Sequence, residues 1–162
     1  MLFSSLRHAA LRLLSEVPGL CVAALVALTP GVQAQDLMPV DLELVLAVDT
    51  SRSMDRDELV LQREGYAAAL EHPAVTSALT MGQLGRAAVM YFEWGGPGVH
   101  RVLADWRLIE GPEDAQAMAA ELRAAPVGNM RGTSISGAME QGALFLDSNG
   151  FQGKRRVIDI SG

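Results

Sequence analysis

The sequence predicts an α/β fold in which a mostly parallel central sheet is covered by helices on both faces. Two observations predict it. Segments rich in β-forming residues alternate with helical segments, and the first β segment is apolar almost throughout. Alternation of strands and helices is typical of sheets with right-handed helical crossovers, and a continuous apolar run is typical of a parallel strand buried on both faces. The chain of 162 residues is long enough for one domain with a single core.

Residues 1–34 have the pattern of a secretory signal peptide. Basic residues that include Arg7 lead into an apolar run over 20–28, and small residues end the segment at Ala34. The apolar run is shorter than the roughly 20 residues that a membrane span needs. We therefore expect signal cleavage, a periplasmic or secreted domain over 35–162, and no membrane span in the mature protein.

Composition narrows the classes of function. Cys21 is the only cysteine and lies in the predicted signal peptide, so the exported domain has to be stable without a disulfide. The net charge is −6 at pH 7, and signal cleavage removes more basic than acidic residues. We therefore do not expect nucleic-acid binding, because it requires a surplus of positive charge.

The first elements can be assigned in chain order. Residues 42–48 are the apolar run and predict the first buried strand. Residues 55–71 predict a helix of about four turns, with Arg63 on the same stripe as apolar residues and Pro73 beyond the end. Residues 84–94 and 100–109 are β-rich and are separated by a glycine- and proline-rich turn, which predicts an antiparallel hairpin.

The second half of the chain predicts two more helices and a strand. One helix opens at Pro112 and ends before Pro126, since proline is favoured at the first helical position and cannot continue a helix. Thr133 is the expected N-cap of the next helix. The segment 157–160 is a short strand candidate near the end of the chain.

The loop after the first strand carries the clearest chemical signal. Asp49-Thr-Ser51-Arg-Ser53 places a carboxylate and two hydroxyls at alternate positions, where a loop can turn them towards one point. Sites in α/β sheets form beyond the carboxyl ends of strands, and Gly132-Thr133 opens a later helix that can reach the same edge. Oxygen ligands alone favour a hard divalent cation such as Mg²⁺ over zinc.

This ligand set favours binding over catalysis. With so few protein charges around it, a bound ion would stay strongly electrophilic and keep an open position for an incoming carboxylate. A catalytic base is not evident, because only His72 and His100 survive signal cleavage and neither belongs to the motif. We expect a docking site for acidic ligands.

The motif Asp49-Thr-Ser51-Arg-Ser53-Met, followed downstream by Gly132-Thr133-Ser, resembles the metal-ion-dependent adhesion site of von Willebrand factor A domains. Residues 91–94 and 157–162 look like the exported bacterial branch of domain of unknown function 1194. The resemblance covers residues 41–162 and implies a Rossmann-like von Willebrand factor A fold. It also implies one Mg²⁺ or Mn²⁺ ion held by Asp49, Ser51, Ser53 and Thr133, and a protein partner that offers a carboxylate to the metal.

The family also uses an aspartate after its fourth strand. Asp159 is the candidate here, but it lies inside the strand pattern, where the alternative is a buried carboxylate satisfied by the backbone or by Arg155. The expected position of the family aspartate is beyond Gly162. The resemblance therefore leads us to expect a fold that is incomplete at its C-terminus.

Two other functions are compatible with parts of this sequence. A haloacid-dehalogenase-like phosphotransferase also places an aspartate after its first strand, but such enzymes resemble one another in a second aspartate two positions later, and that position is Ser51. The other alternative is a metal-free structural scaffold, in which Ser53 or Asp55 only caps a helix. An exported metal-dependent interaction domain without catalysis remains the leading expectation.

Overall fold

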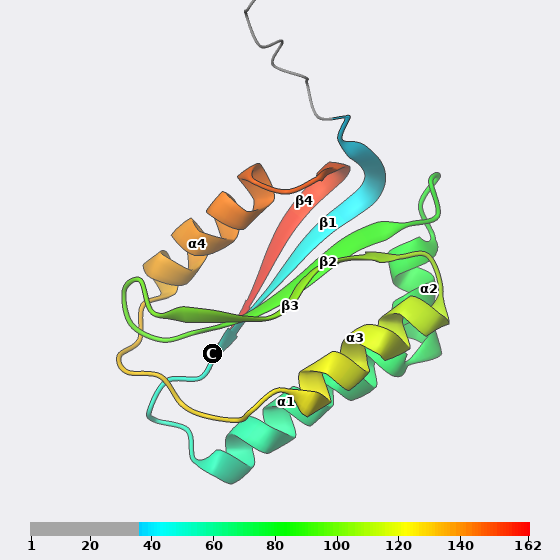
Figure 1. The fold of residues 1–162 in the computed structure, drawn as a ribbon. Helices are drawn as coiled ribbons and strands as arrows, with labels where there is room; N and C mark the ends of the chain where they lie inside the picture. Colours follow the sequence, from blue (N-terminus) through cyan, green and yellow to red (C-terminus); the bar gives the residue numbers. More distant parts are fainter. Residues whose placement is uncertain (1–35) are drawn as a thin grey trace, which may run out of the picture. The chain divides into compact units, whose positions relative to one another are not determined.

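A four-stranded sheet in the order β3-β2-β1-β4 forms the centre of the domain (Figure 1). In the computed structural model, which describes residues 36–162, its strands are β1 (Met38–Asp49), β2 (Ala87–Trp94), β3 (His100–Ile109) and β4 (Phe151–Ser161). β1 is parallel to both β2 and β4, and β3 runs antiparallel to β2 at one edge. The prediction of a mostly parallel sheet with one antiparallel hairpin strand is confirmed, whereas the predicted signal peptide lies outside the described residues.

Helices cover both faces of the sheet, as predicted. α1 (Arg56–Glu71), α2 (Pro73–Thr80) and α3 (Pro112–Ala124) lie on one face, and α4 (Ile135–Asp147) lies on the other (Figure 1). None of the helices within residues 36–162 is long and apolar enough to cross a membrane.

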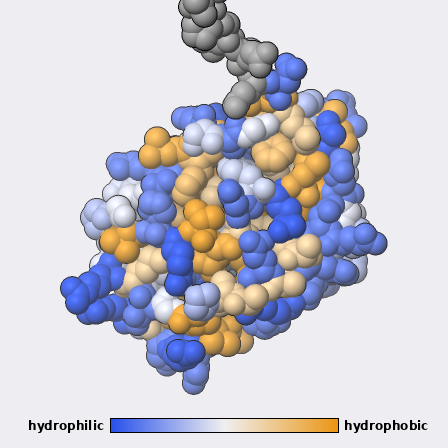
Figure 2. Space-filling model, in the orientation of Figure 1, coloured by the Kyte–Doolittle hydropathy of each residue, from blue (hydrophilic) through white to orange (hydrophobic). Residues whose placement is uncertain are grey.

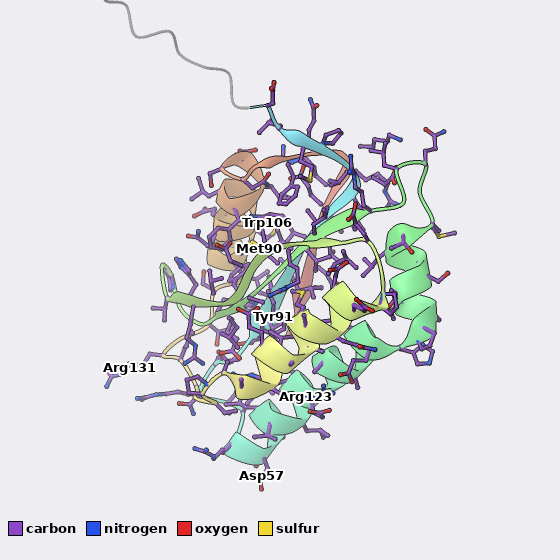
Figure 3. All side chains as sticks on the ribbon, turned by 45° about the vertical axis from the view of Figure 1, so that its right-hand side comes forward. Asp57, Met90, Tyr91, Trp106, Arg123 and Arg131 are labelled. Carbon is purple, nitrogen blue, oxygen red and sulfur yellow. The ribbon has the colours of Figure 1, made fainter. Side chains whose placement is uncertain are left out.

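Two apolar layers hold the helices to the sheet. Val45 and Ala47 of β1 pack towards α4, while the alternate residues Leu46 and Val48 pack towards α1, α2 and α3. β2 is buried along its whole length and divides its side chains in the same way. Figure 3 shows this division, with Met90 on the side of α4 and Tyr91 on the side of α3. Two-sided burial explains why β1 and β2 are apolar almost throughout.

Some predicted boundaries were wrong. The helix after Pro73 was missed, because we interpreted this proline only as the end of α1. In the structure His72 ends α1 and also caps α2, and proline occupies the first turn of the new helix. β4 begins at Phe151, six residues before the predicted strand, because residues 151–156 are mostly polar but still pair with β1.

The surface of the domain mixes hydrophilic and apolar residues. On the face seen in Figure 2, hydrophilic residues cover much of the outer surface, and apolar residues show in patches between them. Val99 and Val102 of the β2–β3 hairpin belong to the exposed apolar residues, with exposed fractions of 40% and 39%.

Candidate metal centre

The first predicted ligands are brought together where β1 ends. Asp49 is the last residue of β1, and its Oδ1 accepts a hydrogen bond of 2.7 Å from the backbone N–H of Ser51. This local bond turns the chain sharply, as aspartate commonly does at the start of a loop. The hydroxyl oxygens of Ser51 and Ser53 then lie 3.1 Å apart. Asp49 and Ser51 are buried, whereas Ser53 is exposed.

The loop that carries Thr133 is attached to the same edge. The backbone N–H of Met130 donates to the carbonyl of Thr50 at 2.7 Å, and Ser51 and Met130 form a parallel bridge. On its other side this loop bonds to the β2–β3 turn, through Ser134 N–H to the carbonyl of Gly95 at 2.8 Å. The predicted convergence of the two loops is therefore present.

Glycines make this close approach sterically feasible. A Cβ atom at Gly95 would lie 2.7 Å from the Cβ of Met130, and one at Gly96 would lie 2.9 Å from the carbonyl oxygen of Arg131. Gly132 has φ +74°, a left-handed conformation that side chains other than hydrogen disfavour. The loop of Thr133 is thus held between the β1–α1 loop and the hairpin turn by backbone contacts.

The prediction that Thr133 caps α4 was wrong. Ser134 is the N-cap, and its Oγ accepts a hydrogen bond of 3.1 Å from the backbone N–H of Gly137. Thr133 is exposed, one residue before the cap. Because Ser134 performs the capping, the fold does not require the Thr133 hydroxyl for the helix.

Asp159 is not brought to these loops. It pairs in register with Leu46, whereas Val48, the residue before Asp49, pairs with Ser161. The expectation of a buried carboxylate was also wrong, because Asp159 is exposed on the edge strand β4. Burial is the main cause that raises the pKa of the nearby Tyr66, and the Asp159 carboxylate raises it further.

Polar groups without hydrogen bonds gather at the end of β1. Oδ2 of Asp49 accepts no hydrogen bond from any residue in 36–162, although Oδ1 does. Three neighbouring buried groups also have no partner within the described part of the chain, namely the Thr50 hydroxyl, the Trp94 indole N–H and the Ser161 hydroxyl. The Asp49 carboxylate and the hydroxyls of Ser51 and Ser53 in the same turn form a hard oxygen donor set, which fits a divalent cation such as Mg²⁺.

A buried ion-pair network, not predicted from the sequence, lies behind the two loops. Arg63 donates to Oε1 of Glu93 at 2.5 Å and to the carbonyl of Ala125 at 2.6 Å, while Arg101 donates to Oε2 of Glu93 at 2.6 Å. Burial raises the pKa of the neighbouring Tyr91 well above its usual value, and the Glu93 carboxylate adds to the rise. The position of Arg63 on an apolar helix stripe was the sequence signal for its burial.

A hollow of about 940 Å³ lies beside the α4–β4 turn, away from the end of β1. It is lined by the α4–β4 turn, by Glu43 and by Trp106, and none of the predicted ligands belongs to it. The predicted metal ligands therefore lie outside this hollow.

Strand order, one antiparallel edge strand and helices on both faces define an α/β domain with a mostly parallel four-stranded sheet. The chain belongs to the family described as protein of unknown function, DUF1194, whose family model matches residues 39–162. No match was found among the curated proteins.

Several solved structures are similar to this chain at low identity. The vWF domain of the type V pili tip protein Mfa5 from Porphyromonas gingivalis is 15% identical with a TM-score of 0.48, and the match covers 74% of this chain and 36% of that one. Pilus adhesin SpaC from Lactobacillus rhamnosus GG is 18% identical with a TM-score of 0.48, and the match covers 76% of this chain and 15% of that one. The chain thus spans well under half the length of these proteins.

Proposed function

We propose that this protein is an exported interaction domain that binds a protein partner through one Mg²⁺ or Mn²⁺ ion. Asp49, Ser51, Ser53 and Thr133 would hold the ion. The observation that carries the proposal is that Asp49, whose Oδ2 has no donor among the described residues, lies in one turn with the paired hydroxyls of Ser51 and Ser53, and that the Thr133 loop is attached to this turn by backbone hydrogen bonds.

The ligand set supports binding of an anionic partner. One carboxylate balances only half the charge of a divalent ion, and the other three side chains are neutral hydroxyls. A bound ion would therefore supply a positive charge and an open position for a carboxylate of the partner. The signal-peptide pattern of residues 1–34 supports a periplasmic or secreted location for this binding.

We propose no catalysis. His72 accepts a hydrogen bond of 3.2 Å from the backbone N–H of Ala74 and so serves as a helix cap. His100 packs edge-on against Phe92 and Phe145 on the α4 face. The haloacid-dehalogenase-like alternative needs an acid at the position of Ser51, whose hydroxyl instead bonds with that of Ser53.

A titration with Mn²⁺ followed by electron paramagnetic resonance tests the metal directly, because the sharp signal of the free ion disappears on binding. We expect one site in the parent protein. Asp49→Asn is expected to weaken it by at least about tenfold, since loss of an outer-shell partner alone commonly costs that much. Asp55→Asn is the matched control, because Asp55 caps α1 and asparagine caps equally well.

The outcomes separate the alternatives. Equal Mn²⁺ binding by the parent and Asp49→Asn would place any metal elsewhere and overturn the proposal. A parent protein that binds no Mn²⁺ would favour the metal-free scaffold. Phosphatase activity that requires Mg²⁺ and is lost in Asp49→Asn would instead support the phosphotransferase alternative.

A further inference from the structure

Two exposed arginines lie on the two loops that meet at the candidate metal centre. Ser51 and Met130 are partners in an isolated parallel bridge that joins the two loops, and Arg52 and Arg131 are the residues that follow these partners. The backbone of Arg131 is fixed by a hydrogen bond of 2.7 Å from Gly96 N–H to its carbonyl. Figure 3 shows the Arg131 side chain extending away from the body of the domain.

These two arginines differ from most others in the domain. Both are exposed, and neither forms a salt bridge or side-chain hydrogen bond with any residue from 36 to 162. Six other arginines of the same range are paired with carboxylates: Arg63, Arg86, Arg101, Arg107, Arg123 and Arg156. Like charges on two loops that meet repel each other, and an anion bound between them relieves the repulsion.

We propose that Arg52 and Arg131 bind a second carboxylate of the partner, next to the one that the metal takes. The partner segment is then an acidic peptide with at least two neighbouring carboxylates. This inference rests on the proposed metal-dependent function. Guanidinium groups suit the task because each presents two parallel N–H donors to a carboxylate.

The charge of the whole protein strengthens the argument. The chain carries a net charge of −6, which repels an acidic partner at long range. Arg52 and Arg131, which form no salt bridge among the described residues, would offset that repulsion where the partner docks. Arg52 and Arg131 therefore select for acidic sequences rather than for any single carboxylate.

Binding of two capped peptides to the protein in Mg²⁺ tests this role. One peptide carries three consecutive aspartates, and the other carries a single aspartate flanked by glycines. We expect Arg52→Gln and Arg131→Gln each to weaken binding of the three-aspartate peptide about two- to fivefold, as loss of an exposed ion pair does. Binding of the single-aspartate peptide should stay unchanged.

Arg155→Gln is the matched control, because Arg155 is exposed and unpaired among the described residues but lies opposite Leu42, towards the start of β1. It should change neither peptide's affinity. If both peptides bind with Mg²⁺ and the arginine variants bind the three-aspartate peptide like the parent, the inference is overturned. If the arginine variants lose affinity but Mg²⁺ has no effect, the arginine pair stands and the metal-dependent function fails.

Discussion

Two buried acidic residues belong to β1, Glu43 in the middle of the strand and Asp49 at its end, and their surroundings differ. Both oxygens of Glu43 are bonded: Oε1 accepts from Gly153 N–H at 2.5 Å, and Oε2 accepts from the Asn149 amide at 2.8 Å, with Arg156 3.8 Å away. Asp49 accepts one local bond at Oδ1, and its Oδ2 has no donor among the described residues.

Glu43 is a carboxylate whose two oxygens are hydrogen-bonded within the fold, whereas Asp49 keeps one oxygen available for a ligand. Glu43 joins β1 to the α4–β4 turn and to β4, because each of its two oxygens accepts a hydrogen bond from these elements. Asp49 faces loops that are fixed mainly by backbone hydrogen bonds, so its free oxygen is not needed for folding. Burial alone therefore does not mark a candidate metal ligand, and an acceptor without a donor in the fold is the better candidate.

The largest expected effect on stability comes from removing the Glu43 carboxylate. Glu43→Ala should lower the free energy of unfolding by about 3 kcal/mol, because Asn149, Gly153 and Arg156 lose a buried partner. Asp49→Ala in chelator should cost about 1 kcal/mol or less, since one local bond is lost. Urea unfolding of both variants measures the difference, and equal losses would contradict the comparison.

A smaller effect is expected where a methyl group is added beside Glu43. A Cβ atom at Gly153 would lie 2.9 Å from Oε1 of Glu43 and 2.8 Å from the carbonyl of Arg155, so Gly153→Ala should cost about 2 kcal/mol. Gly65→Ala is the control, because a Cβ there has open space within α1. That variant should gain about 0.5–1 kcal/mol, since alanine favours helices over glycine. Thermal melts of both variants in chelator check the opposite signs.

The smallest predicted effects separate capping from metal binding at the start of α4. Ser134→Ala should lose about 1 kcal/mol in chelator, as loss of an N-cap does, and keep its response to Mg²⁺. Thr133→Ala should keep its stability in chelator and lose part of its response to Mg²⁺. A Thr133 variant that is destabilised without metal, while Ser134→Ala is not, would reverse the assignment.

The sequence predicted most elements that have a strong apolar period. β1, the hairpin and α1 were found because burial on one or both faces imposes a visible pattern on residues such as Leu46 and Leu59. α2 was missed because proline is compatible both with the end of one helix and with the start of the next. The early part of β4 was missed because an edge strand carries polar side chains that resemble a loop.

The candidate site was predictable only in part. Local spacing sufficed for Asp49, Ser51 and Ser53, because one turn gathers them. Pairing between distant segments decided the rest: the register of β4 keeps Asp159 away from the end of β1, and the bridge at Met130 joins the loop of Arg131 to the loop of Arg52. A single sequence contains neither the register nor the bridge.

The most direct test of the central claim is a thermal melt of the protein with and without Mg²⁺, with Asp49→Ala beside the parent. A ligand that binds only the folded state stabilises it by about 2.7 kcal/mol at a hundredfold excess over its Kd. We predict that Mg²⁺ raises the melting temperature of the parent and leaves that of Asp49→Ala unchanged. If Mg²⁺ does not change the melting temperature of the parent, or if it raises that of Asp49→Ala equally, the proposed role of the Asp49 oxygen is contradicted.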